Sequence, residues 1–268
     1  MENIFAGIYQ KNGVVSFIEK IREIAEKAGE AIIQIYAQDI SVEYKSDKSP
    51  VTLADQNANE IIVSSLQKHF PEIPIISEES PIVDFSERQN WQRLWLIDPL
   101  DGTKEFIKKN GEFTVNIALI ENGEPIFGLI YAPALKEMYY GEKNVGSFKL
   151  VNGAWQKIER KKHYSEKGVV VVATSRSHQS YEVNTFIKRL LRNNVKVSTC
   201  EIGSSLKLCL VAESTADVYP RFGDTMEWDI AAGHAIITFA GGNVFEMGTK
   251  NPLRYNKESL KNPHFIAE

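Results

Sequence analysis

The chain has 268 residues, of which 43% are hydrophobic and 25% charged, and these values are ordinary for a globular protein with a sizeable core. The formal net charge of −4 gives no indication of general affinity for nucleic acids, and a polyanionic ligand would need local lysine, arginine or a metal ion. Residues 1–13 lack the regions of a signal peptide, and the longest uncharged run, 230–245, is too short and too glycine-rich to span a bilayer.

The two cysteines, Cys200 and Cys209, lie among periodically spaced apolar residues. Cysteine in such surroundings packs as a small hydrophobic side chain, so we expect no disulfide. A reducing cytoplasm fits this composition.

The first predicted element is a long helix. Apolar residues recur over 14–38 at the spacing of one helical face, and Ser16 followed by Glu19 predicts a capping box. A short strand over 41–44 and a polar loop over 45–50 are expected to follow.

Acidic residues stand at the ends of the next two elements. A second helix is expected to begin near Thr52, with Asp55 in its first turn, where the helix dipole alone favours an acid. A strand over 73–77 ends at Glu78 and Glu79, which are compatible with an acidic surface turn or with a site. Ligands gather at strand ends in enzymes that contain sheets, and this favours a site.

The most informative stretch follows an apolar run over 94–97, which predicts a buried strand. This strand stops at Asp98, and Asp101 lies three residues further on, directly before Gly-Thr. The two carboxylates and the Leu100 carbonyl would offer several hard oxygen ligands at one point, which suits Mg²⁺. A solvated turn is the alternative interpretation of these residues alone.

The pattern over 113–150 changes to short strands separated by turn residues, which predicts an antiparallel meander. With the two helices this makes an α+β first half. The charged stretch 159–167 is the candidate boundary, so we predict an N-terminal domain over 1–162 and a C-terminal domain over 163–268.

The second half alternates strands and helices, which predicts a small α/β layer with some parallel pairing. Strands are expected over 168–173, 195–200, 216–219 and 243–245, and helices over 181–192, 204–212 and 228–239. Asp229 opens the last helix, where dipole complementarity would again explain an acid. If a cleft gathered Glu78, Asp98, Asp101 and Asp229, their mutual repulsion would require bound cations, although spacing alone does not establish that they meet.

Three motifs together resemble the inositol monophosphatase superfamily of Mg²⁺-dependent, lithium-sensitive phosphatases. They are S-E-E at 77–79, D-P-L-D-G-T at 98–103 and W-D-I-A-A-G at 228–233. The resemblance runs from about residue 14 to the C-terminus and implies a layered α-β-α-β-α sandwich of the inositol monophosphatase and fructose-1,6-bisphosphatase type.

Three further motifs look like the CysQ branch of this superfamily, namely D-G-T-K-E-F at 101–106, G-S-S-L-K at 203–207 and Y-P-R-F-G at 219–223. Inositol-type members more usually read T-T-N-F after the D-G. CysQ-like proteins are 3′(2′),5′-bisphosphate nucleotidases, so the resemblance implies hydrolysis of the 3′-phosphate of adenosine 3′,5′-bisphosphate and of related sulfated nucleotides.

The resemblance also implies a metal site with two to three Mg²⁺ ions. Glu78, Asp98 and the Leu100 carbonyl would hold one ion, and a third, looser ion would lie near Glu78. Asp98, Asp101 and Asp229 would hold the second ion, about 3.5–4 Å from the first as in two-metal phosphoryl-transfer sites.

The catalytic residues implied are Asp55, Thr103 and Glu78. Asp55 would accept a hydrogen bond from Thr103, whose hydroxyl would orient a metal-activated water for in-line attack on phosphorus, without a phosphoenzyme. The backbone N–H groups of Gly102 and Thr103, at an expected helix start, would bind phosphate oxygens.

Substrate contacts are expected from both halves of the chain. The first half and the last helix would contribute the residues around the scissile phosphate, which are Glu78, Leu100, Asp101, Gly102, Thr103 and Asp229. The second half would contribute nucleotide contacts, for which the candidates are His178, Ser204, Lys207 and Arg221. Each candidate could instead be a solvated polar residue. No carboxylate accompanies Ser175–His178, which excludes a Ser-His triad there.

Two other functions stay open. The same chemistry could serve an inositol or sugar monophosphatase, and a different class would be a non-catalytic nucleotide sensor or an RNA-associated regulator. We expect a small nucleotide as partner, no nucleic acid, no transmembrane segment, and a monomer or homodimer. The expected location is the cytoplasm, with peripheral attachment to the inner face of the cell membrane as an option.

Overall fold

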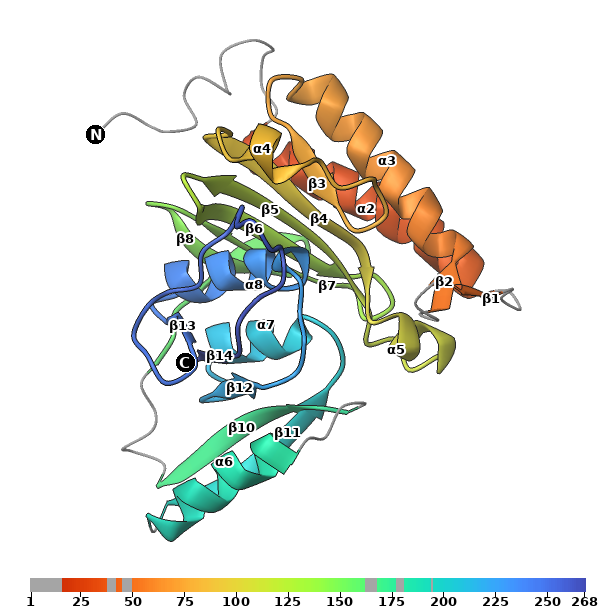
Figure 1. The fold of residues 1–268 in the computed structure, drawn as a ribbon. Helices are drawn as coiled ribbons and strands as arrows, with labels where there is room; N and C mark the ends of the chain where they lie inside the picture. The colour runs from red at the N-terminus through yellow and green to blue at the C-terminus, as the bar shows by residue number, and fades with distance from the viewer. Residues whose placement is uncertain (1–15, 38–41, 45–49, 162–167, 177–180, 194) are drawn as a thin grey trace.

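The computed structural model describes residues 16–37, 42–44, 50–161, 168–176, 181–193 and 195–268, and these form five stacked layers (Figure 1). Helices α2 (Phe17–Tyr36) and α3 (Leu53–His69) cover one face of a seven-stranded sheet. Helices α7 (Leu206–Ala212) and α8 (Glu227–Phe239) cover the other face. A smaller strand layer and helix α6 (Tyr181–Arg192) follow, so the α-β-α-β-α sandwich is confirmed.

The long first helix is confirmed, with Ser16 as its N-cap. The Ser16 hydroxyl accepts a hydrogen bond from Glu19 N at 3.4 Å, whereas the Glu19 carboxylate accepts one from Trp155 Nε1 at 3.0 Å. The predicted capping box is therefore only half formed. Strands β1 (Val42–Tyr44) and β2 (Pro50–Thr52) form an antiparallel pair, so the predicted loop ends before Pro50.

The large sheet has the strand order β3-β4-β5-β6-β7-β8-β9. Only β3 and β4 run parallel, and the following pairs are antiparallel neighbours along the chain, which confirms the predicted meander. The bounds of the strands and of the two short helices near them are β3 Ile75–Ser77, α4 Phe85–Arg88, β4 Arg93–Asp101, α5 Thr103–Ile107, β5 Thr114–Glu121, β6 Glu124–Ala132, β7 Glu137–Glu142, β8 Gly146–Val151 and β9 Ala154–Ile158.

Strand β4 is longer than the predicted 94–97. Its pairing with β5 is regular up to Asp98, breaks, and resumes at Asp101. Pro99 lies inside this break. Proline has no backbone N–H to donate to a neighbouring strand, so it is tolerated where the pairing is interrupted. The irregular stretch places both acids at the end of the strand.

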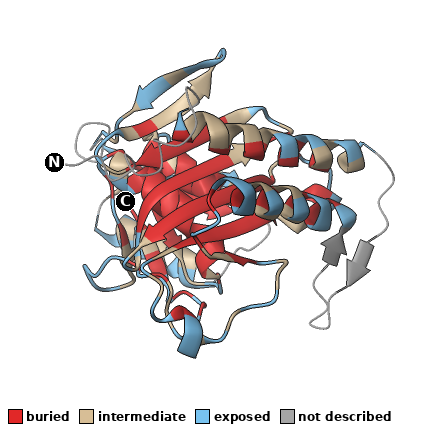
Figure 2. Ribbon diagram, turned by 90° about the horizontal axis from the view of Figure 1, so that it is seen from above, coloured by how far each residue is buried: buried red, intermediate tan, exposed pale blue. Residues whose placement is uncertain are grey.

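Helix α8 approaches the large sheet very closely because glycines face it. A Cβ on Gly128 of β6 would lie 2.3 Å from the Ala232 carbonyl oxygen, and one on Gly141 of β7 would lie 2.7 Å from Ile236 Cα. No larger residue fits at either position without moving the helix. The sheet and α8 therefore share one buried core. Figure 2, seen from the side of α2 and α3, shows the buried strands beneath helices whose outer faces are exposed.

The predicted α/β character of the second half is confirmed. Strands β10 (Val169–Ser175) and β11 (Lys196–Ile202) pair in parallel, with α6 between them in the chain. A second sheet has the order β12-β14-β13, with bounds Tyr219–Arg221, Phe265–Ala267 and Val244–Glu246. The sequence pattern did not indicate β14, and β12 begins where the strand over 216–219 was expected to end.

One hydrophobic cluster contains residues from both sides of the predicted domain boundary. Leu96 and Ala118 of the large sheet belong to it together with Leu208 and Ile236 of α7 and α8. The division at 162 stays a prediction, and this core joins the two parts. Among the described helices none has the length and apolar character needed to cross a bilayer, and both cysteines are free thiols, as expected.

Candidate active site

The structure brings three of the expected carboxylates together at the ends of β3 and β4. Because these strands are parallel, with Ser77 opposite Ile97, the residues that follow them are neighbours. Asp229 approaches from the first turn of α8. Ligand oxygens of Glu78, Asp98 and Asp229 all lie within 4.8 Å of one another.

Asp98 lies at the bottom of this cluster and is 1% exposed. Burial raises the pKa of its carboxyl well above the usual range, and the charges of Glu78 and Asp101 raise the pKa further. One oxygen, Oδ1, accepts a hydrogen bond from Leu100 N at 3.1 Å. Negative charge is therefore unfavourable at this position, and a bound cation would stabilise it.

Asp229 also has a pKa well above its usual range, because of burial and then the charge of Asp101. Its Oδ2 accepts the backbone N–H of Met226 at 2.9 Å, so the carboxylate caps α8 as the dipole argument expects. This bond accounts for one lone pair of one oxygen, and a carboxylate has further acceptor capacity for a ligand. The capping role and a ligand role are thus compatible.

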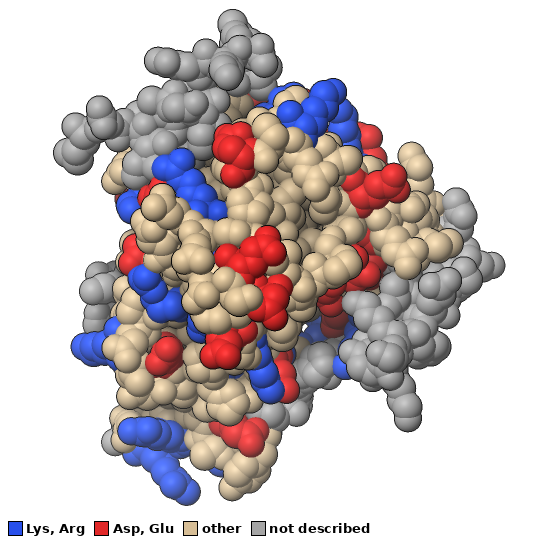
Figure 3. All heavy atoms as spheres, turned by 45° about the horizontal axis from the view of Figure 1, so that its top comes forward, with Lys and Arg blue, Asp and Glu red and all other residues tan. Residues whose placement is uncertain are grey.

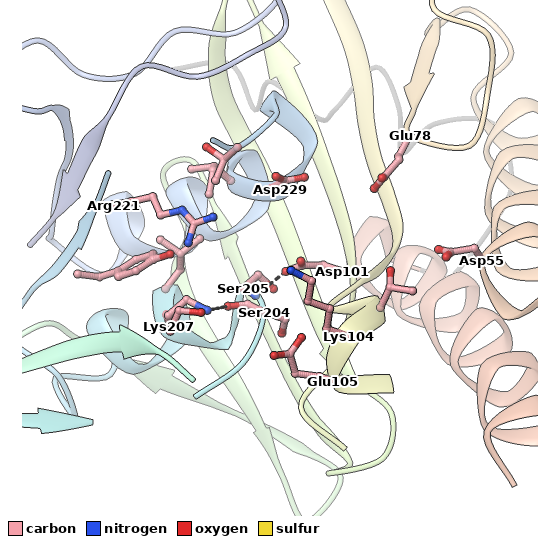
Figure 4. A pocket seen from close by; sticks show the side chains of 17 residues that line it. Asp55, Glu78, Asp101, Lys104, Glu105, Ser204, Ser205, Lys207, Arg221 and Asp229 are labelled. Atoms are coloured by element: carbon pink, nitrogen blue, oxygen red, sulfur yellow. Dashed lines mark hydrogen bonds between the residues drawn. The ribbon is translucent and has the colours of Figure 1, made fainter. Parts of the chain in front are cut away.

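Asp101 lines the same pocket as Glu78 and Asp229 and lies near both of them (Figure 4). Its Oδ2 accepts the backbone N–H of Ser205 at 2.6 Å, a contact between the two halves of the chain. Burial raises the pKa of Asp101, and the charge of Lys207 partly offsets that effect. The carboxylates together form an all-oxygen donor set, the type that Mg²⁺ prefers.

One pocket contains the residues expected to carry out the chemistry and many of those expected to bind substrate. It is lined by Asp55, Glu78, Asp101, Gly102, Thr103, Lys104, Glu105, Ser175, Ser204, Ser205, Lys207, Leu208, Tyr219, Arg221, Thr225, Asp229 and Ile230. Leu100 is 2% exposed and lies outside this lining, and His178 falls outside the described residues. In Figure 4 the acids Glu78 and Asp55 lie on one side of the pocket, and Lys207 and Arg221 lie on the other.

The turn after β4 places Gly102 and Thr103, the residues expected to bind phosphate, at the start of the short helix α5. Gly102 is the N-cap of α5 and has φ +93°, a left-handed conformation that favours glycine. A Cβ there would lie 3.1 Å from Ser204 Cβ, so glycine also permits the second half to approach. Thr103 begins the helix, which leaves the first backbone N–H groups without helical partners.

Lys207 has a more structural environment than the sequence indicated. The side chain is 5% exposed, and its Nζ donates to the Ser204 carbonyl at 2.5 Å and to the Ile202 carbonyl at 3.3 Å. Burial lowers its pKa to about 8, whereas the charge of Asp101 opposes that shift. Lys207 therefore supports the loop that leads into α7.

The Arg221 guanidinium has donor capacity that its contacts within the described residues leave unused. Its Nη2 donates to the Asp224 carbonyl at 3.1 Å, whereas Nε is buried without a partner among the described residues. A buried unpaired donor is costly, so this guanidinium suits a ligand with acceptor oxygens.

A polar network beneath the pocket was missed by sequence reasoning. Ser205 Oγ donates to Asn116 Oδ1 at 2.8 Å and lies 2.7 Å from Thr114 Oγ1. At the rim, the Glu112 carboxylate accepts Gly203 N at 2.8 Å and pairs with Arg176 at 2.8 Å. A polar residue within an otherwise apolar strand was the available signal for Asn116. The contacts themselves join segments about 90 residues apart, which no local pattern reveals.

The charge distribution on the face drawn in Figure 3 is mixed. Acidic and basic side chains of the described residues alternate there, and no broad basic patch covers this face. This distribution offers no extended surface for a nucleic-acid backbone.

Comparison with known proteins identifies close relatives. The model of the inositol monophosphatase family matches residues 15–266. A protein described as 3′(2′),5′-bisphosphate nucleotidase CysQ from Salmonella typhimurium is 45% identical over 253 residues, which cover 92% of this chain and 98% of the relative. The crystal structure of CysQ from Bacteroides thetaiotaomicron has 43% identity and a TM-score of 0.82, and the match covers 93% of this chain and 96% of that one.

Proposed function

The chain belongs to the inositol monophosphatase family, and we propose that it is a Mg²⁺-dependent 3′(2′),5′-bisphosphate nucleotidase. The substrate proposed is adenosine 3′,5′-bisphosphate, with the 3′-phosphate released and AMP as the other product. The corresponding sulfated nucleotide, which would give adenosine 5′-phosphosulfate, is a second candidate substrate. The relatives named as CysQ nucleotidases, at 43–45% identity, support this assignment.

The observation that carries the proposal is the two-sided pocket. Glu78, Asp98 and Asp229 place ligand oxygens within 4.8 Å of one another. Figure 4 shows Glu78 on one side of the pocket and the Arg221 guanidinium on the other, with Asp229 between them. A bisphosphate needs both sides, because one phosphate is hydrolysed while the other is bound. A monophosphate of a small polyol would leave the buried Arg221 donor without an anionic partner.

The all-oxygen donor set fits Mg²⁺, and the family is metal-dependent. Glu78, Asp98 and the Leu100 carbonyl would hold one ion, Asp98, Asp101 and Asp229 another, and a third would lie near Glu78. When bound, the metal ions would neutralise charge on the phosphate and lower the pKa of water.

The protein groups proposed for the chemistry lie around the turn after β4. The backbone N–H groups of Gly102 and Thr103 bind phosphate oxygens at the start of α5. Asp55, 4% exposed in the first turn of α3, accepts the Thr103 hydroxyl hydrogen, so that the hydroxyl oxygen orients the attacking water. Glu78 accepts a proton from that water, and no side chain becomes phosphorylated.

The remaining groups bind the nucleotide. Arg221 forms charge-assisted hydrogen bonds to the 5′-phosphate, and Ser204 and His178 contribute further polar contacts. Lys207 keeps its hydrogen bonds to the Ile202 and Ser204 carbonyls and adds positive charge to the wall of the pocket. A monomer or homodimer in the cytoplasm, with peripheral attachment to the inner face of the cell membrane as an option, stays a prediction.

The test is to incubate the purified protein with adenosine 3′,5′-bisphosphate and to separate the products by ion-exchange chromatography. With millimolar Mg²⁺ we expect AMP and inorganic phosphate in equal amounts, and with excess EDTA we expect neither. Adenosine 3′-phosphate as product would contradict the proposed position of cleavage. Binding of the nucleotide without turnover would instead indicate a nucleotide sensor.

A further inference from the structure

Asn116 is a fully buried polar side chain on β5, and the pocket does not expose it. Its Oδ1 accepts the Ser205 hydroxyl hydrogen at 2.8 Å. Its Nδ2, in contrast, is buried and has no hydrogen-bond partner among the described residues. Leaving a buried donor unpaired is costly, so this NH₂ group is suited to an acceptor in the site above it.

The strand register places Asn116 directly opposite Asp98. Side chains of directly opposed residues project from the same face of a sheet, with Cβ atoms about 4.5–5.5 Å apart. The neighbours two residues away, Leu96 and Ala118, pack in the core with α7 and α8, so Asp98 and Asn116 also face that side. The amide is therefore next to the most deeply buried of the clustered acids.

Hydrogen bonding and charge agree on how the amide is oriented. With Oδ1 toward Ser205, the serine hydroxyl donates and the NH₂ group stays available as a donor to the neighbouring Asp98. The reverse orientation would place the partly negative Oδ1 beside the Asp98 carboxylate, which is unfavourable in a buried site.

Ser205 extends the network to a second acid. While its hydroxyl bonds Asn116, its backbone N–H donates to Asp101 Oδ2 at 2.6 Å. Asn116 thus lies between Asp98 on its own sheet and the loop residue that fixes Asp101.

We propose that Asn116 is a positioning residue for the metal site. Its unpaired NH₂ group lies beside Asp98 and would donate to that carboxylate when it takes up its ligand position, and its carbonyl oxygen holds Ser205 and, through it, Asp101. The inference rests on the proposed function, in which these two aspartates are metal ligands. Outer groups of this kind orient ligating carboxylates, and their loss typically lowers metal affinity by about 10–100-fold.

The test measures binding of Mn²⁺ without nucleotide, from the electron paramagnetic resonance signal of the free ion. The variant is Asn116→Leu, which has a similar shape and lacks both polar groups. Thr114→Val is the matched control, because it is buried on the same strand and loses the bond to Ser205, but leaves the amide intact. We expect the Kd for Mn²⁺ to rise about tenfold or more in Asn116→Leu and to change less than twofold in Thr114→Val.

Asn116→Ala, which leaves space instead of a bulky apolar group, provides the same measurement if Asn116→Leu does not fold. A folded Asn116 variant with a Kd within twofold of wild type would overturn the proposal, as would equal losses in Asn116→Leu and Thr114→Val. A wild-type protein that binds Mn²⁺ but releases no phosphate would overturn the nucleotidase assignment alone. In that case the shift between variants still decides the role of Asn116.

Discussion

At the scale of single residues, the main feature of the site is a group of buried carboxylates whose charged forms are destabilised by their surroundings. Burial raises the pKa values of Asp98, Asp101 and Asp229 above the usual range, and the charges of neighbouring acids in the cluster raise those of Asp98 and Asp229 further. Perturbed pKa values of this kind concentrate at functional sites. The free energy lost in gathering these acids is recovered when a cation binds, so metal binding and folding stability should be linked.

The Asp98→Asn variant tests that linkage. Removing one carboxylate from the buried cluster reduces the repulsion, so the Tm of the variant in metal-free buffer is expected to equal or exceed that of wild type. Millimolar Mg²⁺ should raise the Tm of wild type and leave that of the variant unchanged. Phosphate release by the folded variant should fall by more than about a hundredfold, since a direct ligand matters more than an outer one. Wild-type turnover by a well-folded variant would remove the two-metal arrangement.

Arg221 and Lys207 are expected to differ on substitution, although the sequence suggested similar roles. Arg221→Ala should lower kcat/KM for adenosine 3′,5′-bisphosphate about ten- to a hundredfold, the worth of a charge-assisted hydrogen bond, and spare a small monophosphate ester. Lys207→Ala should lower both activities, because its Nζ holds the two carbonyls of the loop that positions Ser205. Steady-state kinetics on both substrates decides this.

Arg254→Ala is the control for these substitutions, since Arg254 is an exposed arginine whose partner is Glu124. It should leave both activities unchanged. If Arg221→Ala behaves like Arg254→Ala, the assignment of Arg221 to the nucleotide is wrong.

A buried carboxyl away from the pocket gives a pH-dependent prediction. Burial raises the pKa of Glu142, at the end of β7, from 4.5 to about 7. A carboxyl with a higher pKa when folded stabilises the protein at low pH, and this contribution disappears as the pH rises from 4.5 through 7. Glu142→Gln should therefore raise the free energy of unfolding by about 2 kcal/mol at pH 8 and little at pH 4.5.

Urea denaturation at the two pH values measures this effect. Glu30→Gln, on the exposed face of α2, is the control and should change the free energy of unfolding by less than about 0.5 kcal/mol at both. If Glu142→Gln changes the free energy of unfolding by the same amount at both pH values, burial does not raise the pKa of Glu142 and the prediction is wrong.

At the scale of elements, helix α8 is the part whose position matters most. It carries Asp229 at its N-terminus and packs against glycines of β6 and β7. Gly128→Ala would place a methyl group 2.3 Å from the Ala232 carbonyl oxygen, so α8 must shift. We expect a loss of stability of about 1–3 kcal/mol or more and a higher Kd for Mn²⁺, since Asp229 moves with the helix.

Gly153→Ala is the matched control for this substitution. Nothing lies within 4 Å of its added methyl group, and only its φ of +79° opposes a side chain. It should cost about 1 kcal/mol and leave Mn²⁺ binding unchanged. An unchanged stability and Kd in Gly128→Ala would contradict the close packing of α8.

Local patterns predicted most elements of the fold because their signals are local. Apolar periodicity predicted α6 over 181–192, and the observed helix has the same bounds. In contrast, β14 is a three-residue apolar segment, Phe265–Ala267, too short to show a periodic pattern, and it forms because β12 and β13 pair with it. Strand β4 extended past Asp98 because its partner β5 continues, which the following proline concealed.

At the scale of the whole molecule, the site depends on contacts between distant segments. Glu78, Asp98 and Asp229 stand at predictable element ends, but only the β3-β4 pairing and the seating of α8 bring them together. The loop that carries Ser205 reaches Asp101 across more than a hundred residues, and neither residue type signals that bond. The sequence therefore indicated which acids could act, and the tertiary structure shows which of them meet.

The most direct test of the central claim compares kcat/KM for adenosine 3′,5′-bisphosphate, adenosine 3′-phosphate and an inositol monophosphate, each with Mg²⁺ and with EDTA. All three carry a scissile monoester, but only the first presents a second phosphate to the Arg221 side of the pocket. We predict turnover only with Mg²⁺, with the bisphosphate preferred about ten- to a hundredfold over adenosine 3′-phosphate and still more over the inositol ester. Equal or faster hydrolysis of the inositol ester, or undiminished turnover in EDTA, would contradict the account.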